Sequence, residues 1–231
     1  MKFLFVLLSA FLCLATGLQA QSPSPQNSPA AASPTPADDR PASMLPAEAR
    51  FYAEKGNSAF ARDDLNAAQT NYEKVIALAP ENLLGMVNLG AVYYRLKKYP
   101  EAEAILTKAV SRQFKLSAGW MTLGLIYLEQ DRLDEAIAAL EFAAAFDEKN
   151  ARVHNYLGVA AGRKGWYDAA EAELRKALEI DNKLNEPNFN LAVFYLERKP
   201  PAVELARRHY QRALDLGAER DPDIEKKLEK K

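Results

Sequence analysis

The sequence has very few of the residues from which catalytic and metal sites are usually built. It contains one cysteine, Cys13, and two histidines, His154 and His209, among 231 residues. A lone cysteine cannot form a disulfide or a cysteine-based zinc site within the chain. The sequence also lacks the G-x-x-x-x-G-K-[ST], G-x-G-x-x-G, G-x-S-x-G and H-E-x-x-H motifs. We therefore expect no enzyme activity, no cofactor and no bound metal ion.

An excess of charge of one sign is missing as well. The chain has 30 Lys and Arg residues against 31 Asp and Glu residues, which gives a formal net charge of −1. This balance provides no overall attraction to nucleic acid or to an anionic membrane, so no nucleic-acid partner is expected. The content of 48% hydrophobic and 26% charged residues is typical of a soluble globular protein.

The first twenty residues have the layout of a secretory signal peptide. Lys2 is followed by an apolar run and then by the small residue Ala20. A retained membrane anchor is the alternative, but a comfortable membrane span needs ~20 apolar residues. Cys13 follows Leu12 rather than a small residue, which argues against a lipid anchor. We expect cleavage after Ala20, export to the periplasm or the extracellular side of a bacterial envelope, and no stable membrane insertion afterwards.

The segment after the predicted signal peptide is rich in proline, serine and alanine. Residues 21–46 hold seven of the thirteen prolines and almost no large apolar side chains. Such a segment cannot offset the entropy lost on ordering, so we interpret it as a disordered linker. The alternative is that its prolines form a ligand for a partner domain.

Beyond the linker, one pattern recurs every 34 residues. A small residue stands at the same position of each unit: Gly56, Gly90, Gly124, Gly158 and Ala192. A large residue follows sixteen positions later in the first four units: Tyr72, Leu106, Leu140 and Leu174. Glycine is unfavourable inside a helix by about 1 kcal/mol, so its recurrence indicates that two helices approach closely there.

Residues 117–150 carry the fullest version of this pattern, with Trp120, Leu123, Gly124 and Tyr127 in the order W-x2-L-G-x2-Y. The pattern resembles the tetratricopeptide repeat, whose 34-residue unit forms two antiparallel helices. The resemblance implies an all-α, right-handed α-solenoid of helix-turn-helix units. The implied organisation is a signal peptide at 1–20, a linker at 21–46, five repeats within 47–220 (49–82, 83–116, 117–150, 151–184 and 185–220) and a capping helix at 221–231.

The last repeat and the C-terminal segment have their own signals. Pro200 and Pro201 cannot continue a helix, so a longer turn is expected inside the fifth repeat. Asp221 before Pro222 predicts the start of a short helix, whose Ile224 would face the last repeat together with Leu228. Solenoids need such a cap over their terminal apolar face.

The resemblance implies that the protein binds other proteins and has no catalytic role. In this family the first helix of each unit lines a concave groove that holds a peptide or an amphipathic helix. Carried over by position, the candidate partner-binding residues are Asn57, Leu84, Val87, Asn88, Tyr94, Met121, Leu125, Leu128, Asn155, Tyr156 and Asn190. Within this set Leu84, Val87, Met121, Leu125 and Leu128 are expected to form an exposed apolar strip, which usually marks a partner site. The alternative is that they pack among themselves or against the linker.

Two asparagines of this set invite a more specific interpretation. Asn57 and Asn88 match the asparagines with which some family members grip a C-terminal carboxylate. The basic residues of that clamp are replaced by uncharged ones, at Ala53, Ala118 and Thr122, so a carboxylate clamp is not favoured. An asparagine amide still offers a donor and an acceptor to a peptide backbone.

Other roles remain open at this point. The chain could be a self-assembling structural solenoid, and thus a homo-oligomer, or an accessory subunit of an envelope enzyme or secretion complex. The two histidines are interpreted without chemistry: His154 as a packed side chain and His209 as a surface residue.

Overall fold

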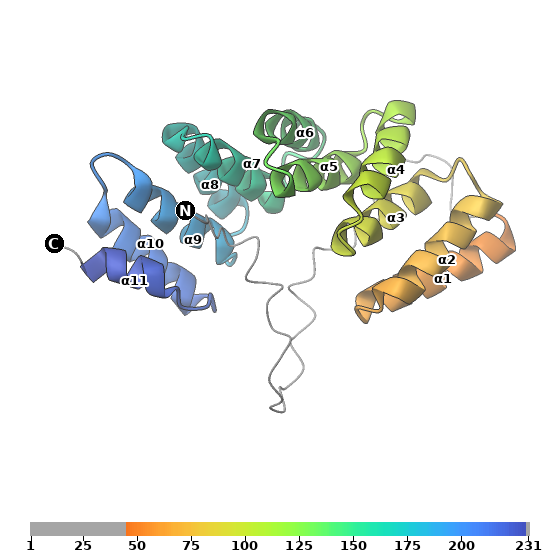
Figure 1. The fold of residues 1–231 in the computed structure, drawn as a ribbon, viewed down its shortest axis with the longest axis horizontal. Helices are drawn as coiled ribbons and strands as arrows, with labels where there is room; N and C mark the ends of the chain where they lie inside the picture. Colours follow the sequence, from red (N-terminus) through yellow and green to blue (C-terminus); the bar gives the residue numbers. More distant parts are fainter. Residues whose placement is uncertain (1–44, 230–231) are drawn as a thin grey trace, which may run out of the picture. The chain divides into compact units, whose positions relative to one another are not determined.

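The computed structural model describes residues 45–229, and all regular secondary structure in that range is helical (Figure 1). The predicted signal peptide, the cleavage site and the linker up to residue 44 lie outside the described residues. The described helices are α1 (Ala47–Ala61), α2 (Leu65–Leu78), α3 (Leu83–Arg95), α4 (Tyr99–Arg112), α5 (Ser117–Glu129), α6 (Leu133–Phe146), α7 (Ala151–Arg163), α8 (Tyr167–Ile180), α9 (Glu186–Glu197), α10 (Val203–Asp215) and α11 (Pro222–Glu229).

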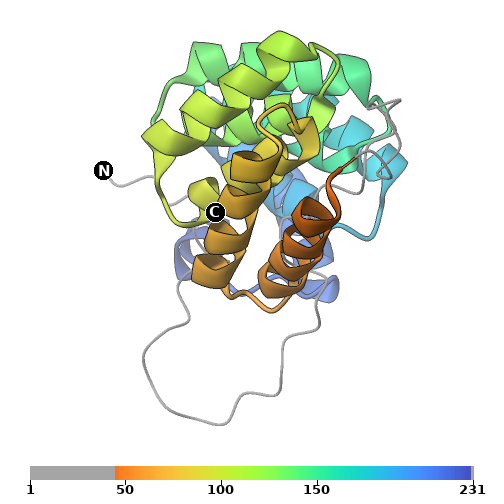
Figure 2. The same cartoon turned by 90° about the vertical axis from the view of Figure 1, so that its right-hand side faces the viewer.

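These helices belong to two compact units. The first unit holds α1–α6 and the second holds α7–α11. Within each unit, consecutive helices pack as pairs; Figure 2 shows α1 and α2 side by side. We call the first helix of each pair its A helix and the second its B helix. The predicted all-α fold of helix-turn-helix units is therefore confirmed.

The recurrent glycines allow the two helices of a pair to touch. A Cβ atom added at Gly124 would lie 2.5 Å from Cγ of Leu140, and one at Gly90 would lie 2.5 Å from Cγ of Leu106. Real Cβ atoms do not approach another carbon so closely, which confirms the packing role predicted for these glycines. In the first pair the residue facing Gly56 is Tyr72, whose ring would lie 2.8 Å from the added Cβ.

The turns between paired helices repeat a backbone feature that sequence reasoning missed. A residue in the left-handed region follows the A helix of the first four pairs: Asp63 (φ 63°), Lys97 (φ 58°), Asp131 (φ 59°) and Gly165 (φ 80°). Only the last is glycine, which adopts this conformation without strain. The fifth pair is different, because α9 ends at Glu197 and α10 begins only at Val203. The longer turn predicted from Pro200 and Pro201 is confirmed.

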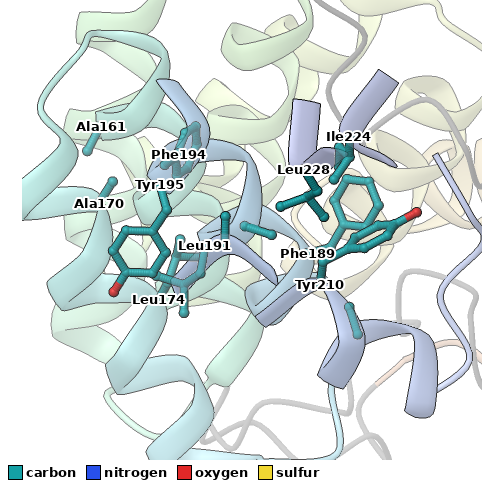
Figure 3. Close-up of a cluster of buried hydrophobic side chains, with 13 residues drawn as sticks. Ala161, Ala170, Leu174, Phe189, Leu191, Phe194, Tyr195, Tyr210, Ile224 and Leu228 are labelled. Atoms are coloured by element: carbon teal, nitrogen blue, oxygen red, sulfur yellow. The ribbon is translucent and has the colours of Figure 1, made fainter. Parts of the chain in front are cut away.

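The C-terminal helix covers the last pair, as predicted. The side chain of Asp221 accepts hydrogen bonds from the backbone N–H groups of residue 223, at 2.8 Å, and of Ile224, at 3.1 Å. Pro222 is the first residue of the helix. Ile224 and Leu228 are buried beside Phe189 and Tyr210 (Figure 3).

Within residues 45–229, no helix is both long and apolar enough to span a membrane.

Candidate protein-binding face

The A helix of the first pair leaves one side open. Arg50, Glu54, Asn57 and Ala61 are all exposed. Their spacing of four, three and four residues places them in one row along α1. This row is polar and carries one charge of each sign. We call the exposed side of α1, α3 and α5 the A-helix face of the first unit.

On α3 this face combines an apolar and a polar side chain. Leu84 is 41% exposed, and Asn88, one turn later, is partly exposed. Val87 is only 3% exposed and belongs to a buried cluster between α3 and its neighbours. α3 contacts α5, and Cγ2 of Val87 would lie 3.7 Å from a Cβ added at Gly119. The expectation that Val87 is exposed is wrong, because α5 approaches α3 at a glycine and covers it.

On α5 most of the predicted apolar strip lies in the interior. Leu125 is 3% exposed and Leu128 is fully buried, while Met121 is partly exposed. α5 is apolar on almost all sides, and a helix of that kind is buried on almost all sides. The expectation of a continuous exposed apolar strip is therefore wrong, and only Leu84 and Met121 remain at the surface.

Tyr94 on α3 is partly exposed and lies between the face and the core. Its ring packs in a tilted arrangement on Tyr99, with 6.2 Å between the ring centroids. Only part of its ring is therefore exposed on the A-helix face.

A tyrosine from the B helix reaches the A-helix face. Tyr72 of α2 is buried, and its hydroxyl donates a hydrogen bond of 2.5 Å to Oδ1 of Asn57. Burial raises the pKa of Tyr72 to about 12, while a hydrogen bond from the Asn88 side chain acts in the opposite direction. The hydroxyl of a buried B-helix side chain thus holds the exposed Asn57 of the face.

In the second unit the predicted asparagines bind each other. Asn155 of α7 and Asn190 of α9 are both buried, and Nδ2 of Asn190 donates to Oδ1 of Asn155 at 3.0 Å. The expectation that these two amides line an exposed groove is therefore wrong. Each amide satisfies the other, as a buried polar group requires. Tyr156 is partly exposed, and burial raises the pKa of its hydroxyl.

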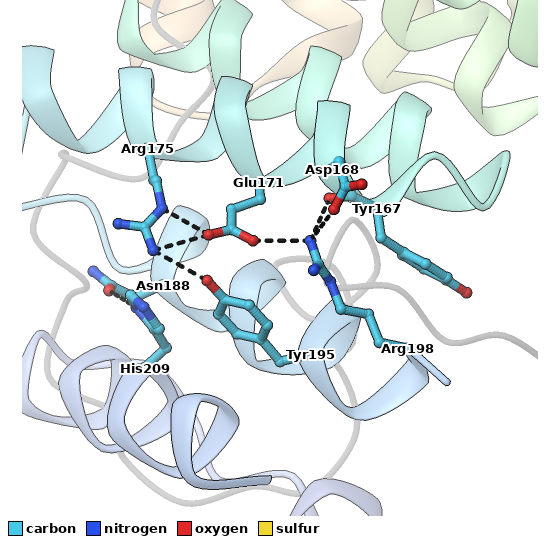
Figure 4. Close-up of polar contacts among 8 residues, drawn as sticks. All are labelled: Tyr167, Asp168, Glu171, Arg175, Asn188, Tyr195, Arg198 and His209. Carbon is cyan, nitrogen blue, oxygen red and sulfur yellow. Dashed lines mark hydrogen bonds and ion pairs between the residues drawn. The ribbon is translucent and has the colours of Figure 1, made fainter. Parts of the chain in front are cut away.

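A polar network in the second unit was not anticipated from the sequence (Figure 4). The carboxylate of Glu171 accepts from Nε of Arg175 at 2.9 Å and from Nη2 of Arg198 at 2.8 Å. Arg175 also donates to the hydroxyl of Tyr195 at 3.2 Å. Burial opposes ionisation of Glu171, but hydrogen bonds from Tyr195 and Arg175 hold its pKa below the ordinary value. These contacts connect α8 with α9, and their evident role is structural.

The two histidines are both held by side-chain partners. His154 is buried, with Nδ1 2.7 Å from Oε2 of Glu173, which agrees with the packing role predicted for it. His209 was expected at the surface, but it is partly buried, stacks on Tyr195, and has Nδ1 2.9 Å from Oδ1 of Asn188. Burial lowers the pKa of His209. The sequence signal that could have shown this is Tyr195, because it lies on α9, the helix that packs against α10, which carries His209.

No group of three or more His, Cys, Asp or Glu side chains within residues 45–229 is arranged to hold a metal ion.

Comparison with known proteins places repeats of one kind along both units. Family models for the tetratricopeptide repeat match residues 54–118 and 151–184, and a TPR repeat model matches residues 124–165. A curated relative, the Protein STIP1 homolog of Dictyostelium discoideum, is 26% identical over 156 residues, which cover 64% of this chain and 27% of the relative. The chain thus spans about a quarter of that relative's length.

Solved structures share the fold. The thermophilic TPR protein TTC0263 of Thermus thermophilus aligns with a TM-score of 0.63 and 22% identity, over 78% of this chain and 96% of that one. YrrB, described as a TPR protein with an unusual peptide-binding site, aligns with a TM-score of 0.58 and 21% identity, over 75% and 87% of the two chains. These likenesses show the α-helical repeat fold.

Proposed function

We propose that this chain, which contains tetratricopeptide repeats, is a non-enzymatic scaffold that binds an extended peptide segment of a partner protein. The binding site is the A-helix face of the first unit. The observation that carries the proposal is the exposure of Asn57, Leu84 and Asn88 together on this face.

The chemistry of the face suits an extended peptide better than an amphipathic helix. An extended peptide has unsatisfied backbone N–H and C=O groups, which asparagine amides can bind, and alternate side chains that need apolar contacts. Leu84 provides such a contact one turn before Asn88 on α3, and Met121 provides another on α5. An amphipathic helix would need a wide apolar groove, and the burial of Val87 and Leu125 removes most of that surface.

The test uses a library of hexapeptides that are acetylated at the N-terminus and amidated at the C-terminus. We expect wild-type protein to select binders, and Leu84→Glu or Met121→Glu to weaken them at least about tenfold, because a carboxylate would be placed against apolar peptide side chains. The thermal midpoint should hardly move, since exposed substitutions usually stay within about 0.5 kcal/mol.

Leu205→Glu is the matched control, because Leu205 on α10 is 41% exposed, the same fraction as Leu84. It should leave peptide binding unchanged. Absence of any binder, or an equal loss in the Leu205 variant, would overturn the proposal.

Self-association is the competing use of the same face. A second copy of the chain would cover Leu84 and Met121, so the apparent mass would rise with concentration and fall in the Leu84→Glu variant. Light scattering across a concentration series distinguishes the two, and we expect a monomer.

We further propose that the protein acts outside the cytoplasm, in the cell envelope. The support is the sequence of the first twenty residues, in which Lys2 precedes an apolar run that ends near Ala20. Intact-mass measurement of protein from the envelope fraction should show a chain that begins at Gln21. A species that keeps Met1 in the membrane fraction would contradict cleavage and release.

A further inference from the structure

Four aromatic side chains of the first unit form a cluster at the surface, beside the connection between α4 and α5. Phe114 in this connection is 50% exposed, and Phe142 on α6 is 38% exposed. Trp120 of α5 and Phe146 of α6 are partly exposed. The centroid of the Phe114 ring lies 5.3 Å from that of Trp120, 4.9 Å from that of Phe142 and 5.5 Å from that of Phe146. We call these four residues the aromatic patch.

The aromatic patch is held in place by its own contacts. Nε1 of Trp120 donates a hydrogen bond of 2.7 Å to the backbone oxygen of Phe114, which ties the connection to α5. The Phe114 ring meets the other three edge to face, and the rings of Trp120 and Phe142 lie 4.8 Å apart in a tilted arrangement. Because the indole N–H already has an acceptor, the patch presents ring surfaces to a ligand rather than a polar group.

The repeat fold does not require an aromatic residue at position 142. The residues at the same position of the first, second and fourth repeats are Lys74, Lys108 and Lys176, and all three are exposed. Position 142 therefore belongs to the solvent side of a B helix, where a ring is not needed to fill the core. The aromatic patch is an addition to the third repeat that the packing of the helix pairs does not explain.

The size of the aromatic patch limits what can cover it. A whole aromatic side chain offers about 200 Å² for burial, so the exposed parts of the four rings sum to about 300 Å² at most. A stable interface between two proteins usually buries about 800 Å² on each partner. The patch alone is too small for a stable dimer, but it matches a few residues of an extended chain.

A proline-rich segment suits a surface made of rings. Such segments dock on aromatic side chains, and each proline lacks the N–H group that would otherwise need an acceptor. Residues 21–44, which precede the described residues, hold six prolines, among them Pro34 and Pro36 in the sequence Ser-Pro-Thr-Pro. This segment leads into α1 and is therefore joined to the same unit that carries the patch.

The segment is long enough to reach the patch. Pro36 lies eleven residues before Ala47, the first residue of α1, and a proline-rich chain of that length extends by about 34 Å. Only the A helix α3 lies between α1 and α5 in the series of A helices, and packed helices are about 10 Å apart, so the span is about 20 Å. A short tether gives an effective concentration of about 1 mM, at which a contact with a Kd of about 1 mM is half formed.

We propose that the aromatic patch is the docking site for the proline-rich segment of the same chain, with Pro34 and Pro36 in contact with its rings. Docking covers the patch and fixes the path by which the segment leaves the repeats. The proposal does not involve the A-helix face and does not depend on the peptide binding proposed for it.

The test measures in the full chain whether the segment lies beside the patch. The chain carries Cys13→Ser and Thr35→Cys, and a nitroxide spin label is attached to the new cysteine. In ¹⁵N–¹H spectra the backbone amide signals of Phe114 and Phe142 should lose most of their intensity, because the label would lie close to both. If these signals keep their intensity, the proposal is wrong.

Variants show whether the contact uses the rings. Phe142→Lys introduces the residue found in three other repeats, and the double change Pro34→Ser, Pro36→Ser alters the segment without touching a helix; each should restore the Phe114 signal. Leu78→Lys is the matched control, because Leu78 on α2 is also 38% exposed, and it should leave the signal loss unchanged. The proposal is overturned if the loss persists in Phe142→Lys or in the double variant.

A mixed sample distinguishes docking within one chain from docking between two copies. Spin-labelled chain without ¹⁵N is mixed with an equal amount of unlabelled ¹⁵N chain. The patch signals should then keep their intensity, because the label is on the other molecule. A loss as large as in the singly prepared sample would assign the patch to the segment of a second copy and would overturn docking within the chain. Neither result bears on peptide binding by the A-helix face.

Discussion

The first and the last helix pairs depart from the three pairs between them in the same way. The middle pairs place Leu106, Leu140 and Leu174 against a glycine. The first pair places Tyr72 against its glycine, and the last pair, whose small residue is Ala192, has Tyr210 in the same buried cluster as that alanine. The two hydroxyl groups have different partners. Tyr72 donates to an exposed side chain at 2.5 Å, whereas Tyr210 accepts the backbone N–H of Asp221 at 2.6 Å, just before the capping helix.

The difference shows how one substitution can serve opposite purposes at the two ends of a repeat array. At the last pair the hydroxyl fixes the chain's own helix α11 over the core, and thereby closes a surface. At the first pair the hydroxyl holds a polar group that remains exposed, on the face proposed here as the binding surface. The middle pairs, with leucine, provide the reference for both.

The largest loss of stability is expected in the middle helix pairs, where a leucine packs against a glycine. Gly124→Leu should lower the free energy of unfolding by about 3 kcal/mol, because even the first added carbon would lie 2.5 Å from Leu140, and overpacking typically costs 1–3 kcal/mol. Urea unfolding followed by circular dichroism measures it. Ala138→Leu, at an exposed position of α6, should have almost no effect. Equal stabilities would show that the helices of a pair can move apart freely.

The next largest loss of stability tests whether the capping helix buries the surface of the last pair while the first unit keeps an exposed face. Leu228→Glu should lower the free energy of unfolding by about 2 kcal/mol or more, since Leu228 is 6% exposed and a buried carboxylate without a partner is unfavourable. Leu84→Glu, at 41% exposure, should cost less than about 0.5 kcal/mol. The comparison fails if the two changes prove equally harmful in the same unfolding assay.

A smaller effect compares the two hydroxyl groups directly. Tyr210→Phe should lower the free energy of unfolding by about 1 kcal/mol, because the N–H of Asp221 loses its acceptor. Tyr72→Phe should lower it less, because water can replace the hydroxyl at the exposed Asn57. Hydrogen exchange adds a local readout, in which α11 should lose protection only in the Tyr210 variant. Loss of protection in α11 after the Tyr72 change would contradict the assignment.

The smallest effect concerns pH. Burial raises the pKa of Tyr72 to about 12, so the unfolded chain ionises this group first, near pH 10. Stability from this residue is therefore complete below pH 10 and is lost as the pH rises toward 12. At pH 10.5 the loss relative to pH 9 is less than about 1 kcal/mol. Unfolding midpoints of wild-type protein and Tyr72→Phe at the two pH values should show a shallower decline in the variant; parallel declines would refute it.

The sequence supported the fold better than the site. Gly90 and Gly124 could be placed correctly because the helix pair is a local unit, in which each glycine meets a leucine of the next helix. The burial of Val87 and Leu125 could not be predicted from the sequence, because it depends on how closely other helices surround α5. The position of a residue within its repeat does not contain that information. The Tyr72 hydroxyl was missed for a related reason: tyrosine and leucine are equivalent as packing residues but differ at their tips.

The buried amide pair of the second unit has a consequence for folding. Repeats of similar sequence can pair in the wrong register, for example with α9 against α5 instead of α7. The residues equivalent to Asn155 in the three preceding repeats are Ala53, Val87 and Met121, none of which can bind an amide. A shift by one repeat would therefore leave Asn190 buried and unsatisfied, at a cost of about 1–3 kcal/mol. The Asn155–Asn190 hydrogen bond identifies α7 as the correct neighbour of α9, and so distinguishes one repeat from another in a chain built by repetition.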